Sequence, residues 1–286
     1  MPSALILSSY VAASRVGGMA QAFALARFGI DPVLIPTTLF GRHPGWGSPG
    51  GAAVEPEVFE AMIAGAQAQG ALAAADVLLT GYFASPEQVA IAAEAIDRAR
   101  KAPRPGRAAL QVIVDPVMGD HDTGLYVPES VAEALARDLA PRADVITPNL
   151  WELGRITGMS AADAQGALQA ARALGWACVV TSVPGAGNQI GALYVDAAIA
   201  RLALHRRFAH VPRGSGDLLS AMFAVGLIEG DAPEDALVRA VGAVADTLEV
   251  AVACGAAELP VVPVWERLVR PKATVRIESL DSIGGV

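Results

Sequence analysis

The stretch Arg213-Gly214-Ser215-Gly216-Asp217 runs directly into the apolar segment Leu218-Leu219-Ser220-Ala221-Met222-Phe223. Two glycines around a serine allow several backbone N–H groups to point toward one spot, and the apolar segment is typical of a helix. Those N–H groups then lie at the positive end of the helix, where an anion such as a phosphate binds. Asp217 stands where the phosphate would arrive. It is either a helix cap or the base that takes a proton from an attacking hydroxyl group.

Short apolar runs alternate with helical patterns through most of the chain. The runs are almost continuously apolar, as expected for strands that are covered on both faces. The predicted strands span residues 4–8, 32–35, 77–80, 110–114, 144–146 and 177–181. A predicted antiparallel pair (189–195 and 198–204) and two helices (217–229 and about 234–254) follow. The pattern predicts an α/β fold with a mostly parallel central sheet, helices on both faces and an antiparallel edge.

Length and composition limit the classes of protein. The 286 residues are 53% hydrophobic and 17% charged, so one large core can form. We expect a single domain over 1–286, with its core at about 4–254 and a peripheral tail from about 272. The net charge of −8 argues against nucleic-acid and anionic-membrane partners, and no apolar run approaches the ~18 residues of a membrane span.

The cysteines and the N-terminal residues indicate the cellular compartment of the protein. Cys178 and Cys254 lie in apolar stretches, so we expect two buried thiols in a reducing compartment. No basic region precedes Ala4-Leu5-Ile6-Leu7, which argues against a signal peptide. Both observations favour a cytoplasmic protein.

Polar groups follow each predicted strand, whereas the strands themselves contain almost none. Ligands of open parallel sheets bind beyond the carboxyl ends of the strands, so this pattern predicts a pocket there. The segments that follow the six strands are Ser9-Tyr10, the Gly- and Pro-rich loop 37–51, Gly81-Tyr82, Asp115-Pro-Val-Met-Gly-Asp120, Thr147-Pro-Asn-Leu-Trp-Glu152 and Thr181-Ser182.

Several of these side chains have both a functional and a structural interpretation. Asp115 and Asp120 can hold Mg²⁺ or its waters, or they can form an Asx-type turn. Asn149 and Glu152 stand one helical turn apart and either order a metal or form a capping box. The Thr181-Ser182 hydroxyls either meet a phosphate or end a solvated strand.

The loop around His43, Phe40-Gly-Arg-His-Pro-Gly-Trp-Gly47, has one tryptophan ring amid glycines. It either closes over a ligand and excludes water or is a poorly ordered excursion.

Together, Asp115-Pro-Val-Met-Gly-Asp120, Thr147-Pro-Asn-x-x-Glu152 and Gly214-Ser-Gly-Asp217 resemble the ribokinase superfamily in order and spacing. The resemblance covers about residues 5–252. Within that superfamily the chain is most similar to pyridoxal kinases, through Ser9, Phe40-x-x-His43 and Gly81-Tyr82. The resemblance implies ATP-dependent phosphorylation of the 5′-hydroxymethyl group of pyridoxal in vitamin B6 salvage.

The resemblance also implies a role for each matching residue. Asp217 would be the base, and Gly214, Ser215 and Gly216 would form the anion hole. The implied metal site for Mg²⁺ consists of Asp115, Asp120 and Glu152. The implied ATP contacts are Asp115, Asn149, Thr181 and Ser182. The implied substrate contacts are Ser9, Tyr82 and His43. K⁺ is implied as a candidate activating ion.

Three positions depart from the pyridoxal kinase pattern. Tyr10 replaces a usual histidine, Gly18 a usual asparagine, and Pro44 a usual threonine that contacts the ring substituents. Two alternatives therefore stay open. The first is a hydroxymethylpyrimidine kinase of thiamin synthesis, which Val16-Gly17-Gly18-Met19 faintly resembles. The second is a non-catalytic vitamer-binding protein on the same fold, although such a protein would lack the base or the anion hole.

Loop 37–53 is too short for the separate lid domain of sugar and nucleoside kinases. Without that lid, the resemblance implies a homodimer in which a neighbouring subunit covers the pocket.

Overall fold

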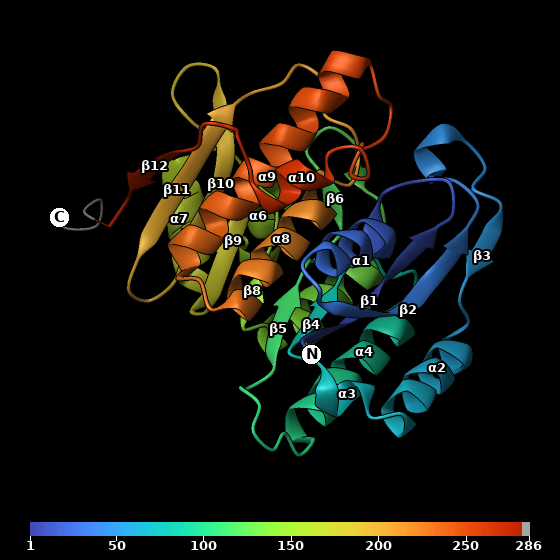
Figure 1. The fold of residues 1–286 in the computed structure, drawn as a ribbon. Coiled ribbons are helices and arrows are strands. Elements are labelled where there is room, and N and C mark those ends of the chain that lie inside the picture. Colours follow the sequence, from blue (N-terminus) through green and yellow to red (C-terminus); the bar gives the residue numbers. More distant parts are fainter. Residues whose placement is uncertain (282–286) are drawn as a thin grey trace.

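A single large sheet forms the centre of the computed structural model, which describes residues 1–281. Its ten strands lie in the order β12-β11-β10-β9-β8-β5-β4-β1-β2-β3 (Figure 1). The six strands from β9 to β2 in this order pair in parallel, and both edges are antiparallel. The strands are β1 (Ser3–Val11), β2 (Asp31–Phe40), β3 (Gly51–Ala53), β4 (Val77–Thr80), β5 (Gln111–Val114), β8 (Val145–Ile146), β9 (Ala177–Pro184), β10 (Gln189–Val195), β11 (Ala200–Arg206) and β12 (Arg276–Ser279).

Helices cover both faces of the sheet (Figure 1). One layer contains α1 (Gly17–Arg27), α8 (Ser215–Glu229), α9 (Pro233–Cys254) and α10 (Trp265–Val269). The other contains α2 (Pro56–Ala68), α3 (Ala71–Ala74), α4 (Pro86–Lys101), α5 (Glu129–Ala134), α6 (Leu150–Thr157) and α7 (Ala164–Leu174). A π-helical stretch (Leu135–Leu139) and a 3-10 turn (Ala140–Arg142) continue α5.

The apolar strands explain this layering. In β1, Leu5 and Leu7 pack under the α4 layer, whereas Ala4 and Ile6 pack under the α1 layer. Side chains alternate along a strand, so a continuously apolar strand buries both faces only when both are covered. The mostly parallel sheet, the helices on both faces and the antiparallel edge confirm the predicted fold class.

Two regions differ from the sequence-based expectations. The second predicted strand was to end at residue 35, but β2 continues to Phe40 and pairs with β3, so the glycine-rich segment is the tip of a β-hairpin. A short 3-10 helix, Pro44–Trp46, lies within this tip. The core was expected to end at about 254. Val261 and Leu268 are nevertheless fully buried, and β12 in the expected tail adds an edge strand to the sheet.

The two thiols also differ. Cys178 is buried as expected, but Cys254 is exposed because it stands at the last turn of α9. Among the helices of the described residues, none is long and apolar enough to cross a membrane.

Candidate active site

The parallel strands point their carboxyl ends toward one edge of the sheet, and the N-termini of α1 and α8 meet there. A small hairpin of β6 (Gly119–Asp120) and β7 (Gly124–Leu125) lies at the same edge. All the predicted site residues are on segments that end or begin at this edge. The sheet topology therefore gathers them into one region.

The N-terminus of α8 has the geometry of an anion site. Gly214 adopts φ +92°, and a β-carbon there would lie 2.7 Å from the carbonyl oxygen of Arg15. Only glycine fits this close approach without strain. The first N–H groups of a helix have no carbonyl partner within the helix, so the amides around Ser215 and Gly216 can bind an anion.

Asp217 lies in the first turn of α8 and faces the start of α1. Its carboxylate Oδ2 accepts a hydrogen bond of 2.8 Å from the backbone N–H of Gly17. Burial raises the pKa of Asp217 to about 6, while the Gly17 N–H acts in the opposite direction. An acid with a pKa near neutrality is suited to accept and release a proton at physiological pH.

Gly17 also lies against Ser9, so Ser9 is close to Asp217. Gly17 adopts φ +55°, and a β-carbon there would lie 2.2 Å from the Ser9 hydroxyl oxygen. Ser9 is buried at the end of β1, next to a register shift between β1 and β2. One glycine therefore contacts both the predicted base and a predicted substrate residue.

Asp115 is buried at the end of β5 within a hydroxyl network. Ser220 donates to its Oδ2 at 2.9 Å, and the Ser220 and Thr147 hydroxyl oxygens lie 3.0 Å apart. Burial raises the pKa of Asp115 well above its usual range, with further contributions from the negative charges of Asp217 and Glu152. Such an accumulation of negative charge is relieved when a cation binds nearby.

Asn149 and Glu152 form a capping box at the start of α6. Asn149 Oδ1 accepts from the Glu152 N–H at 2.9 Å, and Glu152 Oε2 accepts from the Asn149 N–H at 2.8 Å. Glu152 Oε1 also accepts from the N–H of Met118 at 2.9 Å. Burial raises the pKa of Glu152 to about 7 against these hydrogen bonds. The pair therefore supports the turn that follows Asp115.

Asp120 closes the tip of the β6–β7 hairpin. Its Oδ1 accepts from the backbone N–H groups of Asp122 at 3.0 Å and Thr123 at 2.6 Å, and Tyr126 donates its hydroxyl to Oδ2. Burial alone would raise the pKa of Asp120, but these hydrogen bonds lower it below its usual value. Both carboxylate oxygens are thus engaged within the hairpin.

Thr181 and Ser182 lie at an irregular point of β9. Thr181 bridges to Asn149, and its N–H donates to the carbonyl of Pro148 at 2.8 Å. The pairing of β9 with β10 shifts register beside Ser182, which has φ +63°; it is the one non-glycine residue with positive φ among residues 1–281. Such strained backbone and strand irregularities are frequent at functional sites. The bulge brings these two residues beside the α6 capping box.

The 40–51 hairpin tip is ordered by its own side chains and by a distant loop. His43 Nδ1 accepts from the Gly45 N–H at 2.9 Å, and Pro44 takes the first position of the 3-10 helix. The indole N–H of Trp46 donates to Glu258 Oε1 at 2.9 Å, and Ser14 donates to the same oxygen. The loop thus has a defined hairpin conformation with its own contacts, and its closure over a ligand stays a prediction.

The predicted substrate residue Tyr82 follows β4 and is half-buried, which raises its pKa. Its carbonyl accepts from the Thr37 hydroxyl at 2.6 Å. Gln88 connects the same region: its Nε2 donates to the carbonyls of Thr37 and Val54. These contacts hold Tyr82 against the base of the 40–51 hairpin.

Two of the departures from the pyridoxal kinase pattern have a local structural reason. A β-carbon at Gly18 would lie 2.4 Å from a methyl group of Leu34, so an asparagine there requires that leucine to move. Pro44 suits the N1 position of a helix because its φ is already helical. Nothing in the structure explains Tyr10.

Sequence reasoning missed four residues of this network: Gly17, Thr147, Ser220 and Tyr126. Thr147 and Ser220 belong to the quoted motifs, and Ser220 stands three residues after Asp217, on the same side of a helix. That spacing was an available signal. Gly17 and Tyr126 gave no such signal, because their partners are distant or depend on the hairpin fold.

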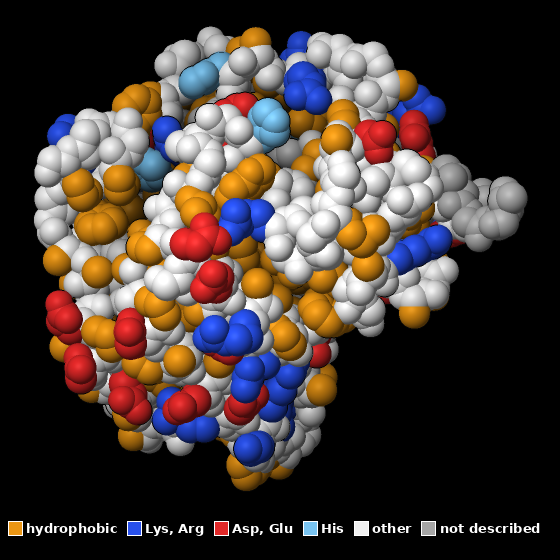
Figure 2. Space-filling view, turned by 180° about the vertical axis from the view of Figure 1, so that it is seen from behind, with side chains coloured by type: hydrophobic (Ala, Val, Ile, Leu, Met, Phe, Trp, Pro, Cys, Tyr) orange, Lys and Arg blue, Asp and Glu red, His pale blue; other side chains and the backbone are white. Residues whose placement is uncertain are grey.

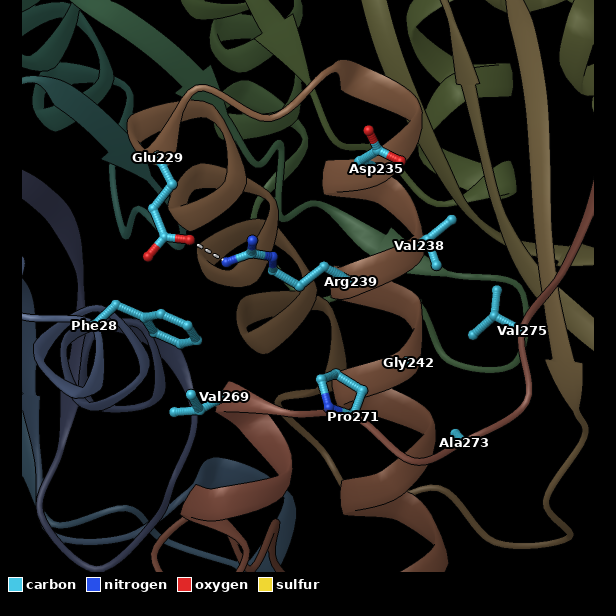
Figure 3. A pocket seen from close by; sticks show the side chains of 10 residues that line it. All are labelled: Phe28, Glu229, Asp235, Val238, Arg239, Gly242, Val269, Pro271, Ala273 and Val275. Carbon is cyan, nitrogen blue, oxygen red and sulfur yellow. Dashed lines mark hydrogen bonds and ion pairs between the residues drawn. The ribbon is translucent and has the colours of Figure 1, made fainter.

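A further cleft lies elsewhere. A cavity of about 620 Å³ lies between the C-terminal ends of α1 and α8, the α9 helix and the 269–275 segment (Figure 3). Its arginine, Arg239, already pairs with Glu229 and Asp231. The cleft is at the end of α8 opposite to Asp217, about 20 Å along the helix at 1.5 Å per residue. It is therefore separate from the predicted phosphate site.

Figure 2 shows Lys and Arg side chains gathered at the end of the molecule that carries the C-terminus of α4. Arg100 pairs there with Asp144, and Arg107 with Asp76. Since α4 runs against the direction of the strands, this patch lies far from the strand carboxyl ends.

Among residues 1–281, no three His, Cys, Asp or Glu side chains form a cluster that could hold a metal ion by themselves. Asp115 is the predicted metal carboxylate with the fewest engaged oxygens. An ion bound here would need most of its ligands from elsewhere.

A mostly parallel sheet whose strand ends hold a carboxylate beside a glycine-built anion site defines a ribokinase-like phosphotransferase. The comparisons with known proteins agree. The chain belongs to the phosphomethylpyrimidine kinase family, whose profile matches residues 53–262.

Relatives and solved structures extend this assignment. The pyridoxine/pyridoxal/pyridoxamine kinase of Bordetella avium is 37% identical over 87% of this chain and 83% of its own. The pyridoxal kinase PdxY of Leifsonia xyli is 31% identical over 94% and 96%. The structure of pyridoxal kinase from Leishmania donovani in complex with ADP and pyridoxamine superimposes with a TM-score of 0.89 at 26% identity, covering 98% of this chain and 100% of that one. The protein is thus a kinase of the ribokinase-like superfamily.

Proposed function

We propose that this protein transfers the γ-phosphoryl group of ATP to the 5′-hydroxymethyl group of pyridoxal and so forms pyridoxal 5′-phosphate. The observation that carries the proposal is Asp217, a carboxylate with a pKa of about 6 beside the anion site at the start of α8. The pyridoxal kinases among its relatives support pyridoxal as the alcohol.

In this proposal Asp217 accepts the proton of the hydroxymethyl group as its oxygen attacks the γ-phosphorus. The bond from that phosphorus to the bridging oxygen breaks, and ADP leaves with the electron pair. The N–H groups of Gly214, Ser215 and Gly216 stabilise the charge on the phosphoryl oxygens. Ser9, Tyr82 and His43 are assigned to the pyridine ring, and Asn149, Thr181 and Ser182 to the nucleotide phosphates.

The carboxylates fit Mg²⁺ as an ion bound mainly by nucleotide phosphates and water. Asp115 supports this fit, because its raised pKa reflects negative charge that a cation would offset. Asp115 would hold the ion or its waters, and Glu152 and Asp120 would hold the turn around it. Mg²⁺ would neutralise charge on the phosphates during transfer. K⁺ is proposed as an activating ion with no residue assigned, and replacement by Na⁺ in the assay tests it.

Three further parts of the proposal concern organisation. We assign residues 1–286 to a single kinase domain that works in the cytoplasm. We also assign a homodimer, supported by the exposed Leu39 and Val58 near the β3 edge, which are 51% and 52% exposed. Sedimentation of the purified protein at several concentrations tests the dimer, and a monomer at all of them would rule it out.

The second candidate substrate is the hydroxymethylpyrimidine. The name of the matching family, phosphomethylpyrimidine kinase, supports a related pyrimidine as the substrate. A panel assay decides between the alcohols: ADP formation is measured with Mg²⁺-ATP and pyridoxal, pyridoxine, pyridoxamine or the pyrimidine. We expect the highest kcat/KM with pyridoxal. Turnover of the pyrimidine without pyridoxal phosphorylation at millimolar substrate would refute the proposal. Binding of pyridoxal without any turnover would indicate a vitamer-binding protein.

A further inference from the structure

Arg213 directly precedes the anion site, and the proposed mechanism gives it no role. Its backbone forms an isolated parallel bridge with Glu258, which fixes the main chain at that point. Its side chain is exposed. Among residues 1–281, no carboxylate lies within ion-pair distance of its guanidinium, and the guanidinium makes no hydrogen bond with them either. Arg213 is therefore a cation without a protein partner beside a site for anions.

The 40–51 hairpin tip packs against this guanidinium. A β-carbon on Gly45 would lie 2.8 Å from both the guanidinium carbon and one terminal nitrogen of Arg213. The absence of a side chain at Gly45 thus makes room for the arginine. The indole N–H of the next residue, Trp46, donates a hydrogen bond to the Glu258 carboxylate. The backbone of Glu258 in turn forms the bridge with Arg213. The tip consequently contacts both partners of that bridge.

Arg213 connects the two halves of the site. Its backbone directly precedes Gly214 of the anion site, and its guanidinium lies against Gly45 of the substrate hairpin. Burial, together with the positive charge of Arg213, lowers the pKa of His43 in that hairpin. In the proposed reaction the phosphoryl group passes between these two halves.

The surrounding charge favours a phosphate ligand. The carboxylates around this place are Asp115, Asp120, Asp217, Glu152 and Glu258. The Glu258 carboxylate already accepts hydrogen bonds from Trp46 and Ser14, and an incoming triphosphate adds more negative charge. A guanidinium offers a planar set of donors that matches phosphate oxygens in pairs. An arginine that contacts the transferred group stabilises the transition state more than the ground state.

We propose that Arg213 is a further catalytic residue, whose guanidinium binds the oxygens of the phosphoryl group during transfer, and that Gly45 and Trp46 hold it in position. The inference rests on the proposed phosphoryl transfer but not on which alcohol is the acceptor. It adds no covalent step: Asp217 takes the hydroxyl proton, and ADP leaves as before.

The test compares Arg213→Gln with Arg42→Gln. Arg42 is the matched control, since it lies in the same hairpin, packs against Gly47 and donates to the Ser48 carbonyl at 2.8 Å. We expect Arg213→Gln to lower kcat by about 100-fold, with KM for both substrates changed by less than about threefold and an unchanged melting temperature. Arg42→Gln should retain the wild-type kcat. A normal kcat in Arg213→Gln, or the same loss in both variants, would overturn the inference.

Three further variants separate catalysis from structure. Added guanidinium ion should raise the rate of Arg213→Ala and leave the rate of Arg42→Ala unchanged, an effect that a structural role would not produce. Gly45→Ala displaces the guanidinium, so it should lower kcat by several-fold and add little to the loss in Arg213→Gln. Absence of rescue together with full additivity would contradict the inference.

Every assay is run with both pyridoxal and the hydroxymethylpyrimidine. Failure of the wild type on pyridoxal alone refutes the proposed function, and Arg213 is then tested on the pyrimidine. If neither alcohol reacts, the slow hydrolysis of ATP by the wild type and Arg213→Gln replaces the kinase assay, because Arg213 is assigned to the phosphoryl group. Equal hydrolysis rates would then refute the role of Arg213.

Discussion

Two carboxylates of the phosphate side lie in the interior, whereas the hairpin tip of the alcohol side is exposed. Asp115 and Glu152 are buried, and their oxygens accept hydrogen bonds from the backbone or from a buried serine. His43 and Pro44 are on a hairpin tip whose Trp46 is 49% exposed. A change on the phosphate side therefore disturbs a buried framework. A change on the alcohol side alters a few surface contacts, which is where a family can vary its substrate.

The largest expected effect is on the phosphate side. Asp217→Asn removes the proton acceptor, so turnover should fall by ~10²–10⁴-fold while ATP binding persists. In the wild type, kcat/KM should decrease as the pH falls below about 6, because the pKa of Asp217 is raised to about 6 and only the carboxylate is a base. Steady-state kinetics from pH 5 to 8 measure both effects.

Asp122→Asn is the control, since Asp122 is exposed nearby. Near-normal turnover in Asp217→Asn would return Asp217 to a capping role.

The stability of the fold gives a second check on Asp217. A carboxyl whose pKa is higher in the folded state than in the unfolded state lowers stability as the pH rises through this range. Asp217→Asn should therefore raise the free energy of unfolding by about 1–3 kcal/mol at pH 8 and by little at pH 4.

The next effect tests how far the phosphate side depends on its buried framework. Glu152→Ala leaves the N–H groups of Met118 and Asn149 without partners, and each buried unpaired group costs about 1–3 kcal/mol. We expect a loss of about 2–4 kcal/mol in the free energy of unfolding, together with a higher Mg²⁺ requirement. Glu152→Gln, which keeps one acceptor oxygen, should lose less. Urea unfolding and Mg²⁺ titration of the activity measure both.

Asp163→Ala is matched to this variant, because Asp163 caps α7 by accepting from the Gly166 N–H. It should cost about 1 kcal/mol of stability with no change in the Mg²⁺ requirement. Should Glu152→Ala behave like Asp163→Ala, Glu152 is only a helix cap.

On the alcohol side, Trp46→Phe removes the hydrogen bond to Glu258 and keeps an aromatic ring. A single hydrogen bond contributes about 0.5–1.5 kcal/mol, so KM for the alcohol should rise by about three- to tenfold with KM for ATP unchanged. Because Trp46 also helps to position Arg213, kcat should fall as well. Trp265→Phe, far from the site and stacked on Arg27, should behave as wild type. An equal rise in KM for ATP would contradict the assignment of this hydrogen bond to alcohol binding.

The smallest effect is expected for Pro44→Thr. The variant regains a hydroxyl that similar kinases place near the ring, but it loses the proline that fits the start of the 3-10 helix. The gain and the loss act in opposite directions, so the affinity for pyridoxal should improve by no more than about threefold. Pro49→Thr in the same hairpin should not improve it. Weaker binding by Pro44→Thr would show that the local backbone outweighs the hydroxyl.

The sequence by itself determined the local features. Apolar strands covered on both faces, helix starts at Asn149 and Gly214, and turns after Asp115 all depend on neighbours a few residues away. The order of strands and helices then required the strand ends to gather, since parallel strands share one direction. The fold class and the identity of most phosphate-side residues followed from these local signals.

Only the tertiary structure decided which residues touch across the site. Gly17 and Asp217 are 200 residues apart, Ser220 and Asp115 are 105 apart, and Trp46 and Glu258 are 212 apart. No periodicity or motif spacing connects such pairs, because each depends on the packing of separate elements. The contact of Arg213 with Gly45 is of the same kind: the arginine was visible in the motif, but its placement over the hairpin required the folded chain.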